Sequence, residues 1–293
     1  MRAAPGHPLN AQHLLTPSDV RVLLDRHGLA PRRADGQNFL VDPNTVRRIV
    51  AAAGLDGDDV VLEVGPGLGS LTSGLVGHVA RIVAVELDAG LVAVLRERFA
   101  DRDDVEVIHA DVLDLDLDEV VVADTVRLVA NLPYNAATPI VMQALASRSV
   151  TDALVMVQRE VGERWAAPVG HRLRSAVSVK IELEAHAHTA LRIPRAVFHP
   201  VPNVDSVMIR LARRDDAPTG AERTAVFALV EAAFAQRRKT LRNTLSRHTD
   251  RERLEAVAAD LGVDLGWRAE QLPAATFRQL AAALAPDGGT PVG

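Results

Sequence analysis

The chain has 293 residues, of which 48% are apolar, so it can bury a full core and form two units. It has no cysteine, its ten histidines are scattered and no apolar run approaches the roughly 18 residues of a membrane span, so we expect a cytoplasmic protein without disulfides, metal or membrane segment. The net charge of −5 argues against a nucleic-acid partner unless the basic residues are clustered.

The leader, residues 1–35, is predicted to contain one helix. Residues 1–12 show no hydrophobic period, and we expect them to be disordered. Thr16 is a good N-cap, Asp19 lies three residues beyond it, and Gly28 is a typical helix end, which together predict a helix between them.

A buried strand is predicted over 59–64, and it runs directly into the glycine-rich turn 65–69. A strand, a glycine turn and then a helix open the sheet of nucleotide-binding α/β proteins, because glycines let the backbone approach a ligand. Ser70 occupies the position where dinucleotide sites have their third glycine. A nicotinamide-dependent oxidoreductase is therefore a disfavoured alternative.

Polar residues stand at the ends of four consecutive predicted strands. In open α/β sheets ligands bind outside the carboxyl ends of the strands, so these side chains are expected to share one site. The second of them lies about 20 residues past the glycines, where a carboxylate binds ribose hydroxyls, and the third can accept from an adenine amine. The four residues are Glu63, Glu86, Asp111 and Asn131.

The motif Asn131-Leu132-Pro133-Tyr134 suits a ring that carries an exocyclic amine. The side-chain oxygen of Asn131 can accept one amine hydrogen, and the Leu132 carbonyl, positioned by Pro133, can accept the other. Tyr134, the only tyrosine of the chain, can stack on the ring.

Further strands are predicted over 153–157, 178–183 and 206–211, with the last two pairing as an antiparallel edge. A proline-rich loop precedes the last strand and contains Phe198, which we expect to be exposed. The residues alone leave open whether this ring packs inside the protein or lies beside Tyr134.

The polar segment 213–220 breaks the hydrophobic pattern, so we place a domain boundary there, between an α/β domain over 36–214 and a helical domain over 220–293. From Arg192 to Arg247 the chain has eleven basic against five acidic residues, which predicts a basic face. The densest cluster, expected to contact RNA phosphates, is Arg237, Arg238, Lys239 and Arg242. The predicted helices are 222–234, 239–246, 251–261 and 273–284.

Taken together, the motifs resemble those of the bacterial 16S ribosomal RNA adenine dimethyltransferases, the kasugamycin-resistance family. The matching stretches run in family order from residue 36 toward the C-terminus. They are Gly36-Gln37-Asn38-Phe39-Leu40, the turn with its preceding Glu63, Glu86-Leu87-Asp88, Asn131-Leu132-Pro133-Tyr134-Asn135, the Phe198–Ser206 loop and the basic run from Phe234 to Asn243.

The resemblance implies a class I S-adenosylmethionine-dependent methyltransferase, with a Rossmann-like seven-stranded sheet and a small all-α C-terminal domain. It implies N6,N6-dimethylation of two adjacent adenosines near the 3′ end of 16S rRNA during small-subunit maturation. We expect the protein to act as a monomer. By position, the cofactor site would comprise Asn38, Leu40, Gly65, Glu86, Asp111 and Asn131. The catalytic residues would be Asn131, Leu132, Pro133, Tyr134 and Phe198.

Two alternatives lie closer to this interpretation than an oxidoreductase. One is the sister family that methylates adenine in 23S rRNA and confers macrolide resistance; Leu132 and the basic run favour the small-subunit enzyme. The other is a ribosome-assembly factor, in which binding is the main role and catalysis is secondary.

Overall fold

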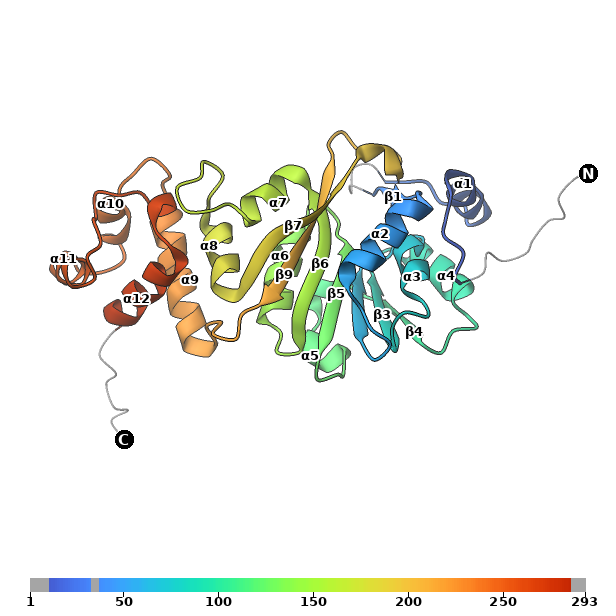
Figure 1. Ribbon diagram of the computed structural model, residues 1–293, viewed down its shortest axis with the longest axis horizontal. Helices are drawn as coiled ribbons and strands as arrows, with labels where there is room; N and C mark the ends of the chain where they lie inside the picture. The colour runs from blue at the N-terminus through green and yellow to red at the C-terminus, as the bar shows by residue number, and fades with distance from the viewer. Residues whose placement is uncertain (1–10, 33–36, 286–293) are drawn as a thin grey trace, which may run out of the picture. The chain divides into compact units, whose positions relative to one another are not determined.

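The computed structural model describes residues 11–32 and 37–285 (Figure 1). Residues 1–10, which belong to the segment 1–12 predicted to be disordered, lie outside these ranges, and so does Gly36 of the first motif. The chain forms two compact units, Met1–Gly162 with His188–Ala212, and Glu163–Ala187 with Arg213–Gly293. The helical unit therefore takes in 163–187, which the predicted boundaries had assigned to the α/β domain.

The first unit contains most of a seven-stranded sheet of order β4-β3-β2-β5-β6-β9-β7. The strands from β4 to β6 are parallel, and β9 pairs antiparallel to β6. The strand order reverses between β2 and β5, the point at which open α/β sheets bind ligands. The strands are β2 Val60–Val64, β3 Arg81–Glu86, β4 Val105–His109, β5 Val126–Asn131, β6 Val150–Gln158, β7 Ala185–Ile193 and β9 Ser206–Arg213.

The helices of this unit are α1 Pro17–Arg26, α2 Pro43–Ala53, α3 Ser70–Leu75, α4 Ala89–Arg98, α5 Leu117–Val120 and α6 Ala137–Ala146, and α7 Arg159–Trp165 spans the two units. Helix α2 lies over the face of the sheet made by β2 and β5, where Ile49 joins Val61 and Val129 in one buried cluster (Figure 1). The predicted N-terminal helix is confirmed, and Thr16 and Asp19 form its capping box. The four consecutive strands predicted to precede the polar residues Glu63, Glu86, Asp111 and Asn131 are confirmed, as are those predicted over 153–157 and 206–211, with small shifts in their ends.

The strand predicted over 178–183 is wrong, because this stretch is the helix α8 Ala176–Glu184. A capping box between Ser175 and Ser178 begins the helix. Val179 and Leu183, four residues apart, enter the core of the second unit, while Ile181 is buried as well. A helix buried on more than one side has no single apolar stripe, and its alternating residues imitate a strand. The predicted pairing of this stretch with 206–211 is therefore also wrong; β6 and β7 flank β9.

The second unit packs α8 with four further helices around one apolar core. They are α9 Gly220–Phe234, α10 Leu241–Leu245, α11 Arg251–Asp260 and α12 Ala274–Leu284. All four were expected, although α10 begins only after Thr240. In the described ranges, no helix is long and apolar enough to cross a membrane.

Candidate active site

A cavity of about 460 Å³ opens at the carboxyl ends of β2, β3 and β5 in the first unit. This volume lies within the range of small-molecule sites, roughly 300–1,000 Å³. Every residue predicted for cofactor binding lines it: Asn38, Leu40, Gly65, Glu86, Asp111 and Asn131. Leu132, Pro133 and Tyr134 line it as well. The structure therefore brings together residues that are up to about a hundred positions apart in the chain.

The glycine turn presents its backbone to this cavity because each of its glycines has a left-handed conformation. The φ angles are 67° at Gly65, 62° at Gly67 and 78° at Gly69, where other residues are strained. A Cβ on Gly67 would also lie 3.2 Å from the ring of Phe39. Glycine is thus required at position 67 for two reasons: the backbone conformation is left-handed, and the Phe39 ring packs closely against the Cα of this residue.

The carboxylate of Glu86 holds the turn against the end of β3. It accepts hydrogen bonds from the backbone N–H groups of Gly67 at 3.0 Å, Leu87 at 2.9 Å and Asp88 at 3.0 Å. Burial raises the pKa of Glu86, while the hydrogen bonds from these three donors lower it and offset part of this rise. A carboxylate oriented in this way offers its remaining lone pairs to the cavity that it lines.

Glu63 is the most buried acid of the site, with 1% of its surface exposed. Its carboxyl accepts a 2.7 Å hydrogen bond from the Thr72 hydroxyl. Burial, assisted by the nearby Glu86, raises the pKa of Glu63 to about 8. At pH 7 the protonated form of this carboxyl is therefore favoured.

The side-chain amide of Asn131 has a defined orientation. Its Nδ2 donates to the backbone carbonyl of Asn38 at 3.3 Å, so Oδ1 is left as the acceptor. Leu132 is fixed by its N–H, which donates to the carbonyl of Met156 at 3.2 Å. No described residue donates to the Leu132 carbonyl. The end of β5 thus supplies two oxygen acceptors from consecutive residues.

Tyr134 is half-buried, and its phenol shares a 2.9 Å hydrogen bond with the hydroxyl of Ser206 on β9. Burial raises the pKa of this phenol, which keeps it neutral. The hydrogen bond holds the ring in place at the cavity. The sequence did not reveal this role of Ser206, because the contact joins residues 72 positions apart.

The expectation that Phe198 is exposed is wrong. Only 2% of its surface is accessible, and it packs with Leu40 and Ile193 in the main core cluster. Its strand, β8 Phe198–His199, pairs antiparallel with β1 Phe39–Leu40, which turns the ring inward. Phe198 is not among the residues that line the cavity, and we do not assign it a role in stacking on the substrate.

Asp111 lines the cavity together with the apolar residues Leu87, Val112, Leu113 and Ile140, of which only Leu87 belongs to a matching motif. Its Oδ1 accepts from the N–H of Leu113 at 2.9 Å, which fixes the carboxylate. Such an acceptor among apolar walls suits a flat heteroaromatic ring with an exocyclic amine. The sequence signal that could have revealed these apolar walls is that Leu87 directly follows Glu86 and Val112 directly follows Asp111.

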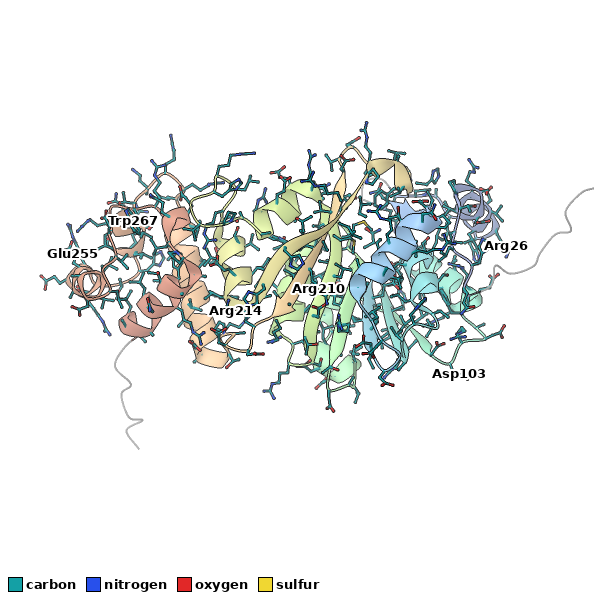
Figure 2. All side chains as sticks on the ribbon, viewed as in Figure 1. Arg26, Asp103, Arg210, Arg214, Glu255 and Trp267 are labelled. Carbon is teal, nitrogen blue, oxygen red and sulfur yellow. The ribbon has the colours of Figure 1, made fainter. Side chains whose placement is uncertain are left out.

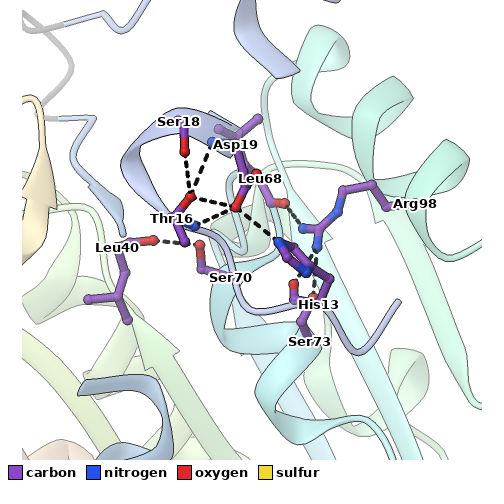
Figure 3. Close-up of polar contacts among 9 residues, drawn as sticks. All are labelled: His13, Thr16, Ser18, Asp19, Leu40, Leu68, Ser70, Ser73 and Arg98. Carbon is purple, nitrogen blue, oxygen red and sulfur yellow. Dashed lines mark hydrogen bonds and ion pairs between the residues drawn. The ribbon is translucent and has the colours of Figure 1, made fainter. Parts of the chain in front are cut away.

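A buried arginine, which sequence reasoning missed, ties the leader to the glycine turn (Figure 3). The guanidinium of Arg98 on α4 donates to the carbonyl of Leu68 in the turn, to the Ser73 hydroxyl at 2.9 Å and to the carbonyl of His13 at 3.2 Å. Burial lowers its pKa to about 10, so it remains charged at neutral pH. The leader therefore supports this cavity, and its Arg32 forms a 3.1 Å ion pair with Asp88 at the cavity wall.

The predicted RNA-binding cluster belongs to the second unit: its first three residues lie between α9 and α10, and Arg242 lies on α10. Arg237, Arg238, Lys239 and Arg242 are all exposed. Arg237 donates to the carbonyl of Arg172 at 2.7 Å, and Arg242 pairs with Glu255. The cluster is accessible to an anionic partner.

Comparisons with known proteins give one consistent family. The model of the family described as "Ribosomal RNA adenine dimethylase" matches residues 28–285. The chain is 48% identical over 275 residues to "Ribosomal RNA small subunit methyltransferase A" of Thermobifida fusca, covering 92% of this chain and 95% of that protein. It is 43% identical over 289 residues to the protein of the same name from Rhodococcus erythropolis, covering 94% and 95%.

Two solved structures share the fold. A dimethyladenosine transferase from Plasmodium falciparum matches with a TM-score of 0.73 and 22% identity, over 83% of this chain and 95% of that one. The 23S rRNA methyltransferase ErmE matches with a TM-score of 0.66 and 28% identity, over 85% and 100%. The predicted α/β methyltransferase fold class is therefore confirmed.

The titration of Glu63 gives a testable pH dependence. The carboxyl has an ordinary pKa of 4.5 in the unfolded chain and a pKa of about 8 in the folded protein. The folded state thus binds an extra proton between these values, a contribution to stability that is complete below pH 4.5 and is lost as the pH rises through about 8. Glu63→Gln mimics the protonated side chain and cannot titrate.

We therefore expect the free energy of unfolding of the wild type to fall relative to Glu63→Gln as the pH rises from about 5 to about 9. Denaturant melts of both proteins across this range measure the difference. Glu119→Gln, on the exposed surface of α5, is the matched control. A difference between wild type and Glu63→Gln that stays constant with pH would contradict the assignment.

Proposed function

Because the chain belongs to the ribosomal RNA adenine dimethylase family, we propose that it dimethylates N6 of two adjacent adenosines near the 3′ end of small-subunit rRNA. S-adenosylmethionine is the methyl donor of this reaction. The observation that carries the proposal is the pair of oxygen acceptors at the end of β5, which borders the glycine turn in one cavity. The monomeric state, the cytoplasmic location, the lack of a metal and a possible additional assembly role stay predictions.

The cavity suits S-adenosylmethionine on three counts. The glycine turn supplies backbone groups close to the ligand, Glu86 can accept from ribose hydroxyls, and Asp111 can accept from the adenine amine between apolar walls. Glu63 adds a buried acid that can compensate positive charge. When bound, the cofactor supplies an electrophilic methyl carbon on a sulfonium.

The residues of this chain act on the acceptor nitrogen. An aryl amine is a weak nucleophile, because its lone pair is delocalised into the ring. In the first transfer, acceptance of its two hydrogens by Asn131 Oδ1 and the Leu132 carbonyl favours a pyramidal nitrogen and stabilises the positive charge that develops on it. In the second transfer the methylated amine has one hydrogen left, which one of the two oxygens accepts. No strong general base is required, since the product cation is acidic.

Tyr134 positions the base. An adenine must leave its stack in RNA to enter a pocket, at a cost of a few kcal/mol. Stacking of the base on an aromatic ring is favourable by roughly 1–3 kcal/mol, which offsets part of this cost. Because the Tyr134 phenol is held by Ser206, little ordering of the ring is needed when the base arrives.

Transfer of tritiated methyl groups tests the function. We expect the protein to methylate small subunits isolated from cells that lack this modification, and nuclease mapping to place the label at adjacent adenosines near the 3′ end. The likeness to ErmE makes large subunits the necessary comparison. Label in 23S rRNA, with none in 16S rRNA, would overturn the proposal in favour of the macrolide-resistance type of activity.

Asn131→Ala should lower the rate of methyl transfer by roughly 100- to 1000-fold, the usual cost of removing one group that stabilises developing charge. Its affinity for small subunits should change little, because Asn131 is only one contact of a large RNA interface. Single-turnover transfer and filter binding measure the two effects. Asn44→Ala, an exposed asparagine of α2, is the control, and wild-type rates in Asn131→Ala would disprove the role of the amide.

A further inference from the structure

The second unit exposes a large aromatic side chain that no step of the proposed function uses. The chain has two tryptophans. Trp165 is 2% exposed, whereas Trp267, on the loop before α12, is 41% exposed (Figure 2). Leaving an aromatic side chain of this size in water forgoes a large hydrophobic gain, so an exposed tryptophan is a marker of recognition surfaces.

The loop that carries Trp267 is held by hydrogen bonds and by one buried side chain. The side-chain carboxylate of Asp264 accepts a 2.7 Å hydrogen bond from the N–H of Gly266, and the backbone carbonyl of Asp264 accepts a 3.0 Å hydrogen bond from the N–H of Trp267. Between them, Leu265 is buried in the core of the unit. The tryptophan is therefore exposed on a fixed backbone, which lowers the entropy lost when a partner binds it.

Two backbone hydrogen bonds place this loop beside the basic segment. The N–H of Leu241 donates to the carbonyl of Trp267 at 2.8 Å, and the N–H of Arg242 donates to the carbonyl of Leu265 at 3.0 Å. Trp267 is thus a direct neighbour of a segment that is 26 residues away in the sequence. Arg268, which follows it, is also exposed.

The basic segment that is hydrogen-bonded to the Trp267 loop carries cations that favour an anionic partner. Arg238 and Lys239 are exposed, and within the described ranges neither of them forms an ion pair with an acid. An aromatic face beside unpaired cations is the combination with which proteins bind unstacked RNA: the ring stacks on a base, and the cations contact the phosphates on either side.

We propose that Trp267 stacks on an unpaired base of the small-subunit rRNA, while Arg238 and Lys239 contact the adjoining phosphates. This inference rests on the proposed function, since it takes rRNA as the partner. It assigns a binding contact remote in sequence from every motif of the cavity. The contact contributes to affinity for the particle, and it takes no part in methyl transfer itself.

Steady-state kinetics on undermethylated small subunits test the contact. Trp267→Leu keeps an apolar side chain and removes the stacking face, so it should raise KM for the particle by roughly 5- to 150-fold, the range for one base–aromatic stack. Its kcat and its KM for S-adenosylmethionine should stay unchanged. Trp267→Phe should recover part of the loss. Leu261→Ala removes a similarly exposed apolar side chain from the same unit, and it should leave the KM for the particle unchanged.

The wild-type protein provides a second measurement that does not depend on a variant folding. Since Trp165 is buried, acrylamide quenches chiefly Trp267. Binding of small subunits should protect this fluorescence from the quencher. An unchanged KM in Trp267→Leu, or unprotected fluorescence in the bound wild type, would overturn the inference. Failure of the proposed function is distinguishable, because the wild type would then transfer no methyl groups to these particles.

Discussion

The hydrogen bond from Asn131 Nδ2 to the Asn38 carbonyl is the contact on which the proposed recognition of adenine depends. An asparagine amide can present either a donor or an acceptor, and this bond commits its nitrogen to the protein. The oxygen then stands with the Leu132 carbonyl as a pair of acceptors. A pair of acceptors selects an amine with two hydrogens, as adenine offers at N6, and would leave a carbonyl-bearing base with unfavourable contacts.

The same constraint explains why the N-terminal part of the chain belongs to the site. Asn38 and Phe39 precede the sheet, and they reach the cavity because β1 pairs with β8 and because Ser70 donates to the carbonyl of Leu40. Arg98 joins the leader to the glycine turn from the other side. The turn is thus held by backbone conformation, by Glu86 and by a buried cation.

Sequence reasoning located the cavity because Gly65, Glu86, Asp111 and Asn131 follow a local rule: each ends or closely follows a predicted strand. Asn38 and Leu40 obey no such rule and were found only through the resemblance of their motif. It failed where the cause is tertiary. Residues 178–183 alternate like a strand, yet burial on several sides makes them a helix. Phe198 was expected to be exposed because neither its own segment nor that of Leu40 contains a local pattern that predicts their pairing. The roles of Arg98 and Ser206 depend on long-range contacts that no local pattern signals.

A structure of the protein with S-adenosylhomocysteine and a short RNA that contains the target adenosines would show how the adenine is held. We expect its N6 to lie at hydrogen-bonding distance, about 2.7–3.2 Å, from both Asn131 Oδ1 and the Leu132 carbonyl oxygen. An N6 beyond hydrogen-bonding reach of both oxygens, or an Asn131 amide that turns its nitrogen toward the base, would contradict this expectation.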